Sequence, residues 1–166
     1  PQPRTPGVVN AATRLAKNGL IVDKFYAMHL CTPARGAYLT GKYPIHTGLQ
    51  ADLVETTSPW GLSATKEQSL PILLQGAGYE THLIGKWHLG HNYPYRAQDR
   101  GFKHVVIHSA GGVGQAPDYW GNDYFDDTYI KNGIYEKFNG FCTDIWFDEA
   151  IKFIKQNKNK VVIHMK

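Results

Sequence analysis

The stretch Gln68–Gly90, QSLPILLQGAGYETHLIGKWHLG, decides the fold of this chain. Its first part, Gln68–Gln75, has the apolar spacing of an amphipathic helix, and the two glycines that follow end that helix. Tyr79–Ile84 then predicts a strand, and Gly85–Gly90 predicts the loop after it. A helix that runs directly into a strand is typical of α/β layering around a sheet.

The same alternation continues on both sides of this stretch. Downstream, we expect long surface loops over 91–141 with a strand near Val105–Ile107, then a helix over Asp144–Gln156 and a strand from Val161 to Ile163. Upstream, the predicted elements are a helix over Val8–Lys17, a strand over Leu20–Tyr26, a helix over Pro33–Thr40 and a loop over 45–66. The pattern predicts an α/β fold with a mostly parallel sheet flanked by helices.

Composition sets broad limits on the class of protein. The chain has 166 residues and a formal net charge of +4, which suits one ordinary globular domain. Its lysine cluster, Lys152 to Lys160, follows one predicted helix and indicates a solvated face, so no nucleic-acid partner is expected. No apolar run is long enough to span a bilayer. The chain starts without Met and stops inside a predicted strand, so we expect 1–166 to be part of a larger catalytic domain, incomplete at both ends.

Cys31 stands out because of the residues that follow it. Thr32-Pro33 is typical of a helix N-cap and first turn, which places Cys31 just before a helix N-terminus, where anions are favoured. Arg35 adds a permanent charge with planar donors on the first turn of the same helix. A buried structural cysteine is the ordinary alternative. The combination of a reactive group and a fixed positive charge suits attack on a tetrahedral oxyanion such as sulfate or phosphate.

Two motifs resemble those of the sulfatase family, closest to its arylsulfatase branch. They are Cys31-Thr32-Pro33-Ala34-Arg35 followed by Leu39-Thr40-Gly41, and Gly78-Tyr79-Glu80-Thr81 followed by Ile84-Gly85-Lys86-Trp87-His88. With similar flanks, the resemblance covers nearly the whole chain and implies an alkaline-phosphatase-like fold. His29 and Tyr38 depart from the family's usual residues, which concerns only packing around the helix after Cys31.

The resemblance also implies a reaction. In the family, the residue matching Cys31 is oxidised to formylglycine by a maturation enzyme that reads Cys-x-Pro-x-Arg, and the hydrated aldehyde attacks the sulfur of a sulfate ester. The alcohol leaves, and the remaining hydroxyl expels sulfate. By resemblance, Arg35 holds the hydrate, Lys86 binds sulfate and hydrate, and His88 hydrogen-bonds to the formylglycine hydroxyl. Cys31, Arg35, Lys86 and His88 are therefore the predicted catalytic residues, with Lys86 and His88 also binding substrate.

Family members bind one calcium ion through oxygen ligands, the preference of a hard cation. The resemblance predicts that residue 31, as formylglycine, is the calcium ligand in this chain and that the other ligands lie outside it. Asp126-Asp127 and Asn122-Asp123 could imitate such ligands, but both pairs are expected in surface loops. His164, on the last predicted strand, is expected to pack rather than to act as a catalytic acid.

The remaining polar and aromatic candidates lie after the second motif. Ser109, with His108 as the alternative, is predicted to line the sulfate pocket and bind substrate. Tyr119 and Trp120 are expected either to stack on a sugar or aryl ring or to pack their own loop.

The predicted function is sulfuric ester hydrolysis, acting on an aryl sulfate or a sulfated glycan, with the 166-residue chain alone inactive. A truncated remnant or a sulfate-ester-binding module is the alternative from outside enzymology. A phosphatase or phosphodiesterase of the same superfamily is a second alternative; Cys31 with Pro33 and Arg35 speaks against it, because those relatives use Ser or Thr with two metals. A cysteine phosphatase would need Arg where Ala37 stands. By resemblance, the location is periplasmic or secreted.

Overall fold

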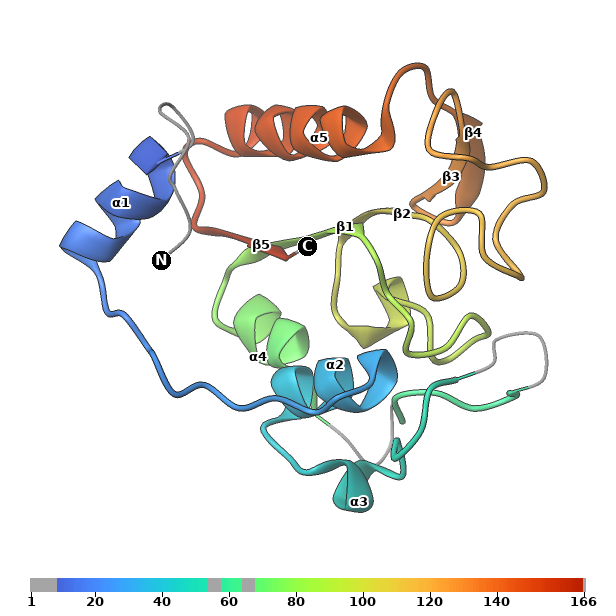
Figure 1. The fold of residues 1–166 in the computed structure, drawn as a ribbon, viewed down its shortest axis with the longest axis horizontal. Helices are drawn as coiled ribbons and strands as arrows, with labels where there is room; N and C mark the ends of the chain where they lie inside the picture. Colours follow the sequence, from blue (N-terminus) through green and yellow to red (C-terminus); the bar gives the residue numbers. More distant parts are fainter. Residues whose placement is uncertain (1–8, 54–57, 64–67, 166) are drawn as a thin grey trace.

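A computed structural model describes residues 9–53, 58–63 and 68–165 of the chain (Figure 1). The first half is helical. Its elements are α1 (Val9–Asn18), α2 (Cys31–Thr40), α3 (Pro44–Thr47) and α4 (Leu70–Gly76). The second half supplies the strands. Its elements are β1 (Glu80–Gly85), η1 (Gln98–Arg100), β2 (His104–Ile107), β3 (Thr128–Lys131), β4 (Ile134–Lys137), α5 (Cys142–Gln156) and β5 (Val162–Met165).

These strands form one five-stranded sheet in the order β4-β3-β2-β1-β5. Its central part is parallel: β1 pairs with β2 and with β5, so that His82 lies opposite His104 on one side and His164 on the other. The hairpin β3–β4 extends the sheet with antiparallel pairing. The predicted α/β fold is confirmed, with a parallel centre and an antiparallel edge.

Helices cover both faces of the sheet, with α5 on one side and α2 and α4 on the other (Figure 1). Side chains alternate between the two faces, as the period of two in a strand requires. On β1, Leu83 enters the core beneath α2, while Ile84 enters the core beneath α5. On β2, Val105 and Ile107 join Leu83, while Val106 joins Ile84. Each core therefore has one wall made of alternate residues of the same two strands.

Helix α5 matches its prediction in extent but buries a narrower face than its apolar pattern indicates. Ile145, Trp146 and Phe153 are buried against the sheet. Ile151 and Ile154, predicted for the same face, are 47% and 46% exposed. The lysines of the predicted solvated face are exposed, and Lys160 forms an ion pair with Glu80.

The predicted strand over Leu20–Tyr26 is wrong. The segment between α1 and α2 runs along the outside of the molecule without strand pairing (Figure 1). Its apolar side chains are exposed, for example Leu20 at 88% and Tyr26 at 88%. Residues of high β propensity form a strand only where a neighbouring strand supplies hydrogen bonds, and no strand of the described chain pairs with this segment.

The hairpin β3–β4 was not predicted, since 91–141 was expected to be loop apart from one strand. Its turn is Asn132-Gly133, with positive φ at both residues, which is the conformation of the tightest hairpins. Asn132 also accepts a hydrogen bond from the Val105 backbone N–H at 2.9 Å, so its side chain ties the turn to β2. Across the described ranges, no helix is long and apolar enough to cross a membrane.

Candidate active site

Cys31 is the first residue of α2, and not the residue before the helix as predicted. The N-cap is Leu30, in an extended conformation and without a side-chain capping bond. Cys31 is exposed at this end of the helix, where backbone N–H groups and the positive end of the helix dipole favour an anion. The thiol therefore lies at the start of a helix as predicted, although the helix begins at Cys31 and not at Pro33.

Thr32 is fully buried and joins three separate segments. Its hydroxyl donates to the His88 carbonyl at 2.9 Å and accepts from the Leu53 N–H at 3.2 Å. Its backbone N–H donates to the Asp52 carboxylate at 2.8 Å. The prediction that Thr32 is an N-cap is wrong, because its hydroxyl serves backbone groups of distant loops instead of its own helix.

Arg35 fastens α2 to the loop after β1. Its Nε donates to the Trp87 carbonyl at 2.8 Å, and a terminal guanidinium nitrogen donates to the Lys86 carbonyl. Burial lowers the pKa of Arg35 from its ordinary value, while the nearby Cys31 acts in the opposite direction; arginine stays charged in either case. The side chain thus holds the loop and brings a positive charge next to Cys31.

His88 is buried and has the left-handed backbone φ of 57°, which is strained for a residue with a Cβ. Its Nε2 lies 3.1 Å from the Leu53 carbonyl, which can only accept, so Nε2 carries a hydrogen. In the neutral ring, Nδ1 is then the basic nitrogen. The Thr32 bond to the same residue's carbonyl supports this conformation.

A possible ligand cluster sits at the start of α2. The Cys31 Sγ, a carboxylate oxygen of Asp52 and a ring nitrogen of His88 lie within 4.8 Å of one another. Calcium takes roughly six to eight oxygen ligands. The cluster offers one carboxylate, and a formylglycine hydrate at residue 31, if made from the thiol, would add an oxygen. This donor set fits one side of a calcium site and does not complete it.

Asp52 lies in the segment 45–66, which was predicted to be loop, and was not predicted as a site residue. Its partner Thr32 is 20 residues away, and His88 is farther still, so no local spacing marks it. Lys86 follows β1 directly and is partly exposed, and its backbone carbonyl accepts a hydrogen bond from Arg35. The structure therefore gathers Cys31, Arg35 and the loop with Lys86 and His88 at one edge of the sheet.

Ser109, predicted to line the sulfate pocket, lies on the loop after β2. It is buried, and its N–H donates to Asp118 at 2.9 Å. This loop comes close to His88 at Gly111, where an added Cβ would lie 3.1 Å from the His88 ring. His108 points elsewhere: its Nδ1 lies 2.6 Å from the Ser109 carbonyl, and its ring is near Trp146.

The acidic pairs after this loop are structural. Asp127 is buried and accepts from the N–H groups of Asp123 and Tyr124 and from the Tyr129 hydroxyl. Burial, together with that carboxylate, raises the pKa of Tyr129 well above its ordinary value. Asp126 is exposed and accepts from the Gly140 N–H. Asp127 is thus buried rather than on a surface loop, and its oxygens accept from two backbone N–H groups and one side-chain hydroxyl.

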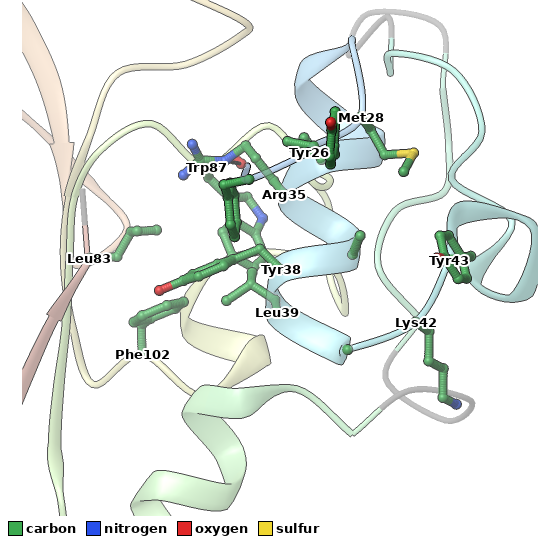
Figure 2. Close-up of a pocket in the computed structure, with 15 residues that line it drawn as sticks. Tyr26, Met28, Arg35, Tyr38, Leu39, Lys42, Tyr43, Leu83, Trp87 and Phe102 are labelled. Carbon is green, nitrogen blue, oxygen red and sulfur yellow. Dashed lines mark hydrogen bonds between the residues drawn. The ribbon is translucent and has the colours of Figure 1, made fainter. Parts of the chain in front are cut away.

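A groove of about 600 Å³ runs along the flank of α2 (Figure 2). Tyr38 extends from α2 toward Phe102 and Leu83, and Arg35 passes behind Trp87 (Figure 2). Tyr38, one of the two residues that depart from the family pattern, is 65% exposed and forms part of the groove wall. Cys31, Lys86 and His88 do not line the groove.

Comparison with known proteins identifies the class. The family model described as Sulfatase matches residues 1–165, and the chain belongs to this family. It is 37% identical over 149 residues to an N-acetylglucosamine-6-O-sulfatase of Bacteroides thetaiotaomicron, covering 89% of this chain and 23% of that protein. It is 37% identical over 167 residues to the N-acetylgalactosamine-6-sulfatase of Sus scrofa, covering 87% of this chain and 31% of that protein. The chain thus spans less than a third of either relative.

The fold comparison agrees with the family. A solved structure in complex with its substrate D-glucosamine-2-N,6-O-disulfate superposes with a TM-score of 0.70 and 32% identity. The match covers 93% of this chain and 28% of that chain. The observed sheet with its flanking helices is therefore the corresponding part of the sulfatase fold.

Proposed function

We propose that the protein is a sulfuric ester hydrolase whose reactive group is formylglycine made from Cys31. One observation carries the proposal: the exposed Cys31, on the first residue of α2, lies within 4.8 Å of both His88 and Asp52. Family membership supports the reaction class. Because the chain spans less than a third of the curated relatives, the activity is proposed for the complete gene product.

Each residue has a role that follows from its position. A formylglycine at residue 31 would, as its hydrate, supply the attacking hydroxyl. Arg35 holds the loop after β1 through two backbone carbonyls and offers positive charge to an anion at residue 31. Lys86, as a point charge on that loop, binds the sulfate oxygens. His88, whose Nε2 hydrogen is engaged by the Leu53 carbonyl, exchanges a proton at Nδ1.

The cluster also favours a calcium ion. Residue 31, as formylglycine, and Asp52 are the oxygen donors that would hold it, together with ligands from other parts of the complete protein. A bound cation supplies positive charge that stabilises negative charge on the hydroxyl and on the sulfate oxygens. A calcium-dependent rise in melting temperature of the complete protein would support this part, and an unchanged melting temperature would favour an inactive remnant.

The test is to produce the complete gene product beside a formylglycine-generating enzyme. Mass spectrometry of the peptide containing residue 31 should show an aldehyde in place of the thiol, and the protein should release sulfate from 4-nitrophenyl sulfate or a 6-sulfated hexosamine. Cys31→Ala should abolish release, while Cys142→Ala, at the buried cysteine of α5, should retain it. A thiol in every preparation, or equal activity in Cys31→Ala, would refute the proposal.

A further inference from the structure

The side chains of Cys31, Asp52 and His88 bring three different donor atoms together at the start of α2. A thiol sulfur, a carboxylate oxygen and a ring nitrogen lie within 4.8 Å of one another. The proposed hydrolysis uses this place only after the thiol has been replaced by an aldehyde. The protein that still carries the thiol has a different metal chemistry, because sulfur and oxygen ligands prefer different ions.

The donor set of the thiol form suits zinc better than calcium. Calcium binds oxygen ligands, whereas two of the three donors here are sulfur and nitrogen. Zinc binds thiolate, imidazole and carboxylate, and three protein ligands with one water complete its tetrahedral shell. The thiolate and the carboxylate together also supply two negative charges, which match the charge of a divalent ion.

The His88 ring is held in a tautomer that can bind a metal. Its Nε2 lies 3.1 Å from the Leu53 carbonyl, so Nε2 carries the hydrogen and Nδ1 has the lone pair. A metal-bound histidine usually donates its second ring N–H to a carboxylate or a backbone carbonyl in this way, which fixes the orientation of the ring. Because His88 is also buried, its ring is positioned as a nitrogen donor before any ion binds.

Asp52 is held in place as well, whereas Cys31 is able to move. Oδ1 of Asp52 accepts the Thr32 N–H at 2.8 Å, and a carboxylate has further lone pairs for a metal besides this bond. Cys31 is exposed on the first residue of α2. Ligand atoms on one tetrahedral zinc ion lie roughly 3–4 Å apart, from bond lengths of about 2.0–2.3 Å. A small rotation of the exposed thiol therefore completes the arrangement.

We propose that the protein, while residue 31 is still a cysteine, binds one zinc ion through Cys31, Asp52 and His88, with water as the fourth ligand. Zinc takes the thiolate, so binding releases the thiol proton to solvent and needs no oxidant. The bound ion covers the sulfur and makes the zinc form an inactive state. Replacing that sulfur by oxygen removes the ligand that favours zinc and leaves a site for a hard cation.

The test uses the complete gene product, produced without a formylglycine-generating enzyme and freed of metal. Zinc binding is measured by calorimetry, and cobalt(II), a coloured substitute for zinc, should give a thiolate-to-cobalt absorption band. Cys31→Ala should remove that band and lower the zinc affinity about 100-fold or more, since a lost ligand costs at least as much as a lost outer-shell partner. Asp52→Asn, which keeps an acceptor for the Thr32 N–H, should lower the affinity about 10- to 100-fold.

Cys142→Ala, at the other cysteine, and His46→Gln, at an exposed histidine on α3, are the matched controls and should bind zinc as the wild type does. Without any substitution, zinc should also slow the alkylation of Cys31 by iodoacetamide. Absence of zinc binding, a cobalt complex without the thiolate band, or an affinity unchanged in Cys31→Ala would overturn the site. If zinc binds as expected but the formylglycine-bearing protein releases no sulfate, the zinc site stands and the proposed hydrolysis fails.

Discussion

Two irregular regions of the molecule are held in opposite ways. At the reactive centre, the bonds of Thr32, Arg35 and His88 join residues 20 to 56 positions apart. In the loop after β2, Asp118 accepts from Ser109, Gly114 and Asn122, all within nine positions. Asp127 likewise binds groups within four positions.

The difference shows that a loop can be held either by hydrogen bonds between near neighbours in the sequence or by hydrogen bonds between distant segments. Bonds between near neighbours form as soon as a loop takes the right backbone turns, because little chain must be ordered to make them. Bonds across 50 residues form only after α2 has docked on the sheet. The hydrogen bonds around Cys31 should therefore be lost together with the global fold, while the loop after β2 should be able to open locally. The following variants test that contrast, from the largest expected effect to the smallest.

Arg35→Lys should have the largest effect, on catalysis. Lysine retains the charge but not the planar fork that binds the Trp87 and Lys86 carbonyls together. We expect kcat/KM of the matured protein to fall about 10²-fold, the range for a displacement of roughly 1 Å in the groups that position a substrate, because the loop after β1 loses its attachment to α2. Arg14→Lys, on the exposed face of α1, is the control and should keep its rate. A fall of less than threefold in Arg35→Lys would show that charge alone suffices.

Thr32→Val should destabilise the whole protein. The shape is retained, but the Leu53 N–H and the His88 carbonyl each lose a buried partner. The free energy of unfolding should fall by about 2–3 kcal/mol, measured in urea. Thr143→Val, at a partly exposed threonine on α5, should change it by no more than about 0.5 kcal/mol. Equal small effects from both variants would contradict the role of Thr32 as a long-range link.

Asp118→Ala should act locally. Three N–H groups lose their acceptor. The free energy of unfolding should fall by about 1–2 kcal/mol, because water can hydrogen-bond to these groups in the loop. Hydrogen exchange of the Ser109 and Gly114 amides should accelerate, while the Leu53 amide, held by Thr32, should keep its protection. Faster exchange at Leu53 would mean that the two regions are not independent.

Glu80→Gln should have the smallest effect. Glu80, on β1, accepts from Lys103 and Lys160 near the starts of β2 and β5, and these bonds lower its pKa from the ordinary value of 4.5. A lowered carboxylate pKa stabilises the fold above 4.5, and this contribution disappears as the pH falls below that value. Because the lysine partners are exposed, this contribution to stability is less than about 1 kcal/mol. Unfolding curves at pH 7 and pH 3 should differ less for Glu80→Gln than for the wild type.

The sequence by itself determined the elements whose signals are local. Apolar periodicity located α4, β1, α5 and β2, since each has a face that must be buried whatever its neighbours are. The paired motifs around Cys31 and Lys86 indicated the family, and their residues do meet at one edge of the sheet. The roles of Cys31, Arg35, Lys86, His88 and Ser109 remain predictions.

The tertiary structure decided everything that depends on distant partners. The Thr32 hydroxyl, predicted to cap its helix, instead links two loops through the His88 carbonyl and the Leu53 N–H. The fold also places Asp52 beside Cys31. It left the β-prone segment Leu20–Tyr26 unpaired and exposed, and it added the β3–β4 hairpin to the sheet edge. A hydrogen bond or a strand pairing needs two partners, and when the second lies far along the chain, only the folded arrangement shows which one it is.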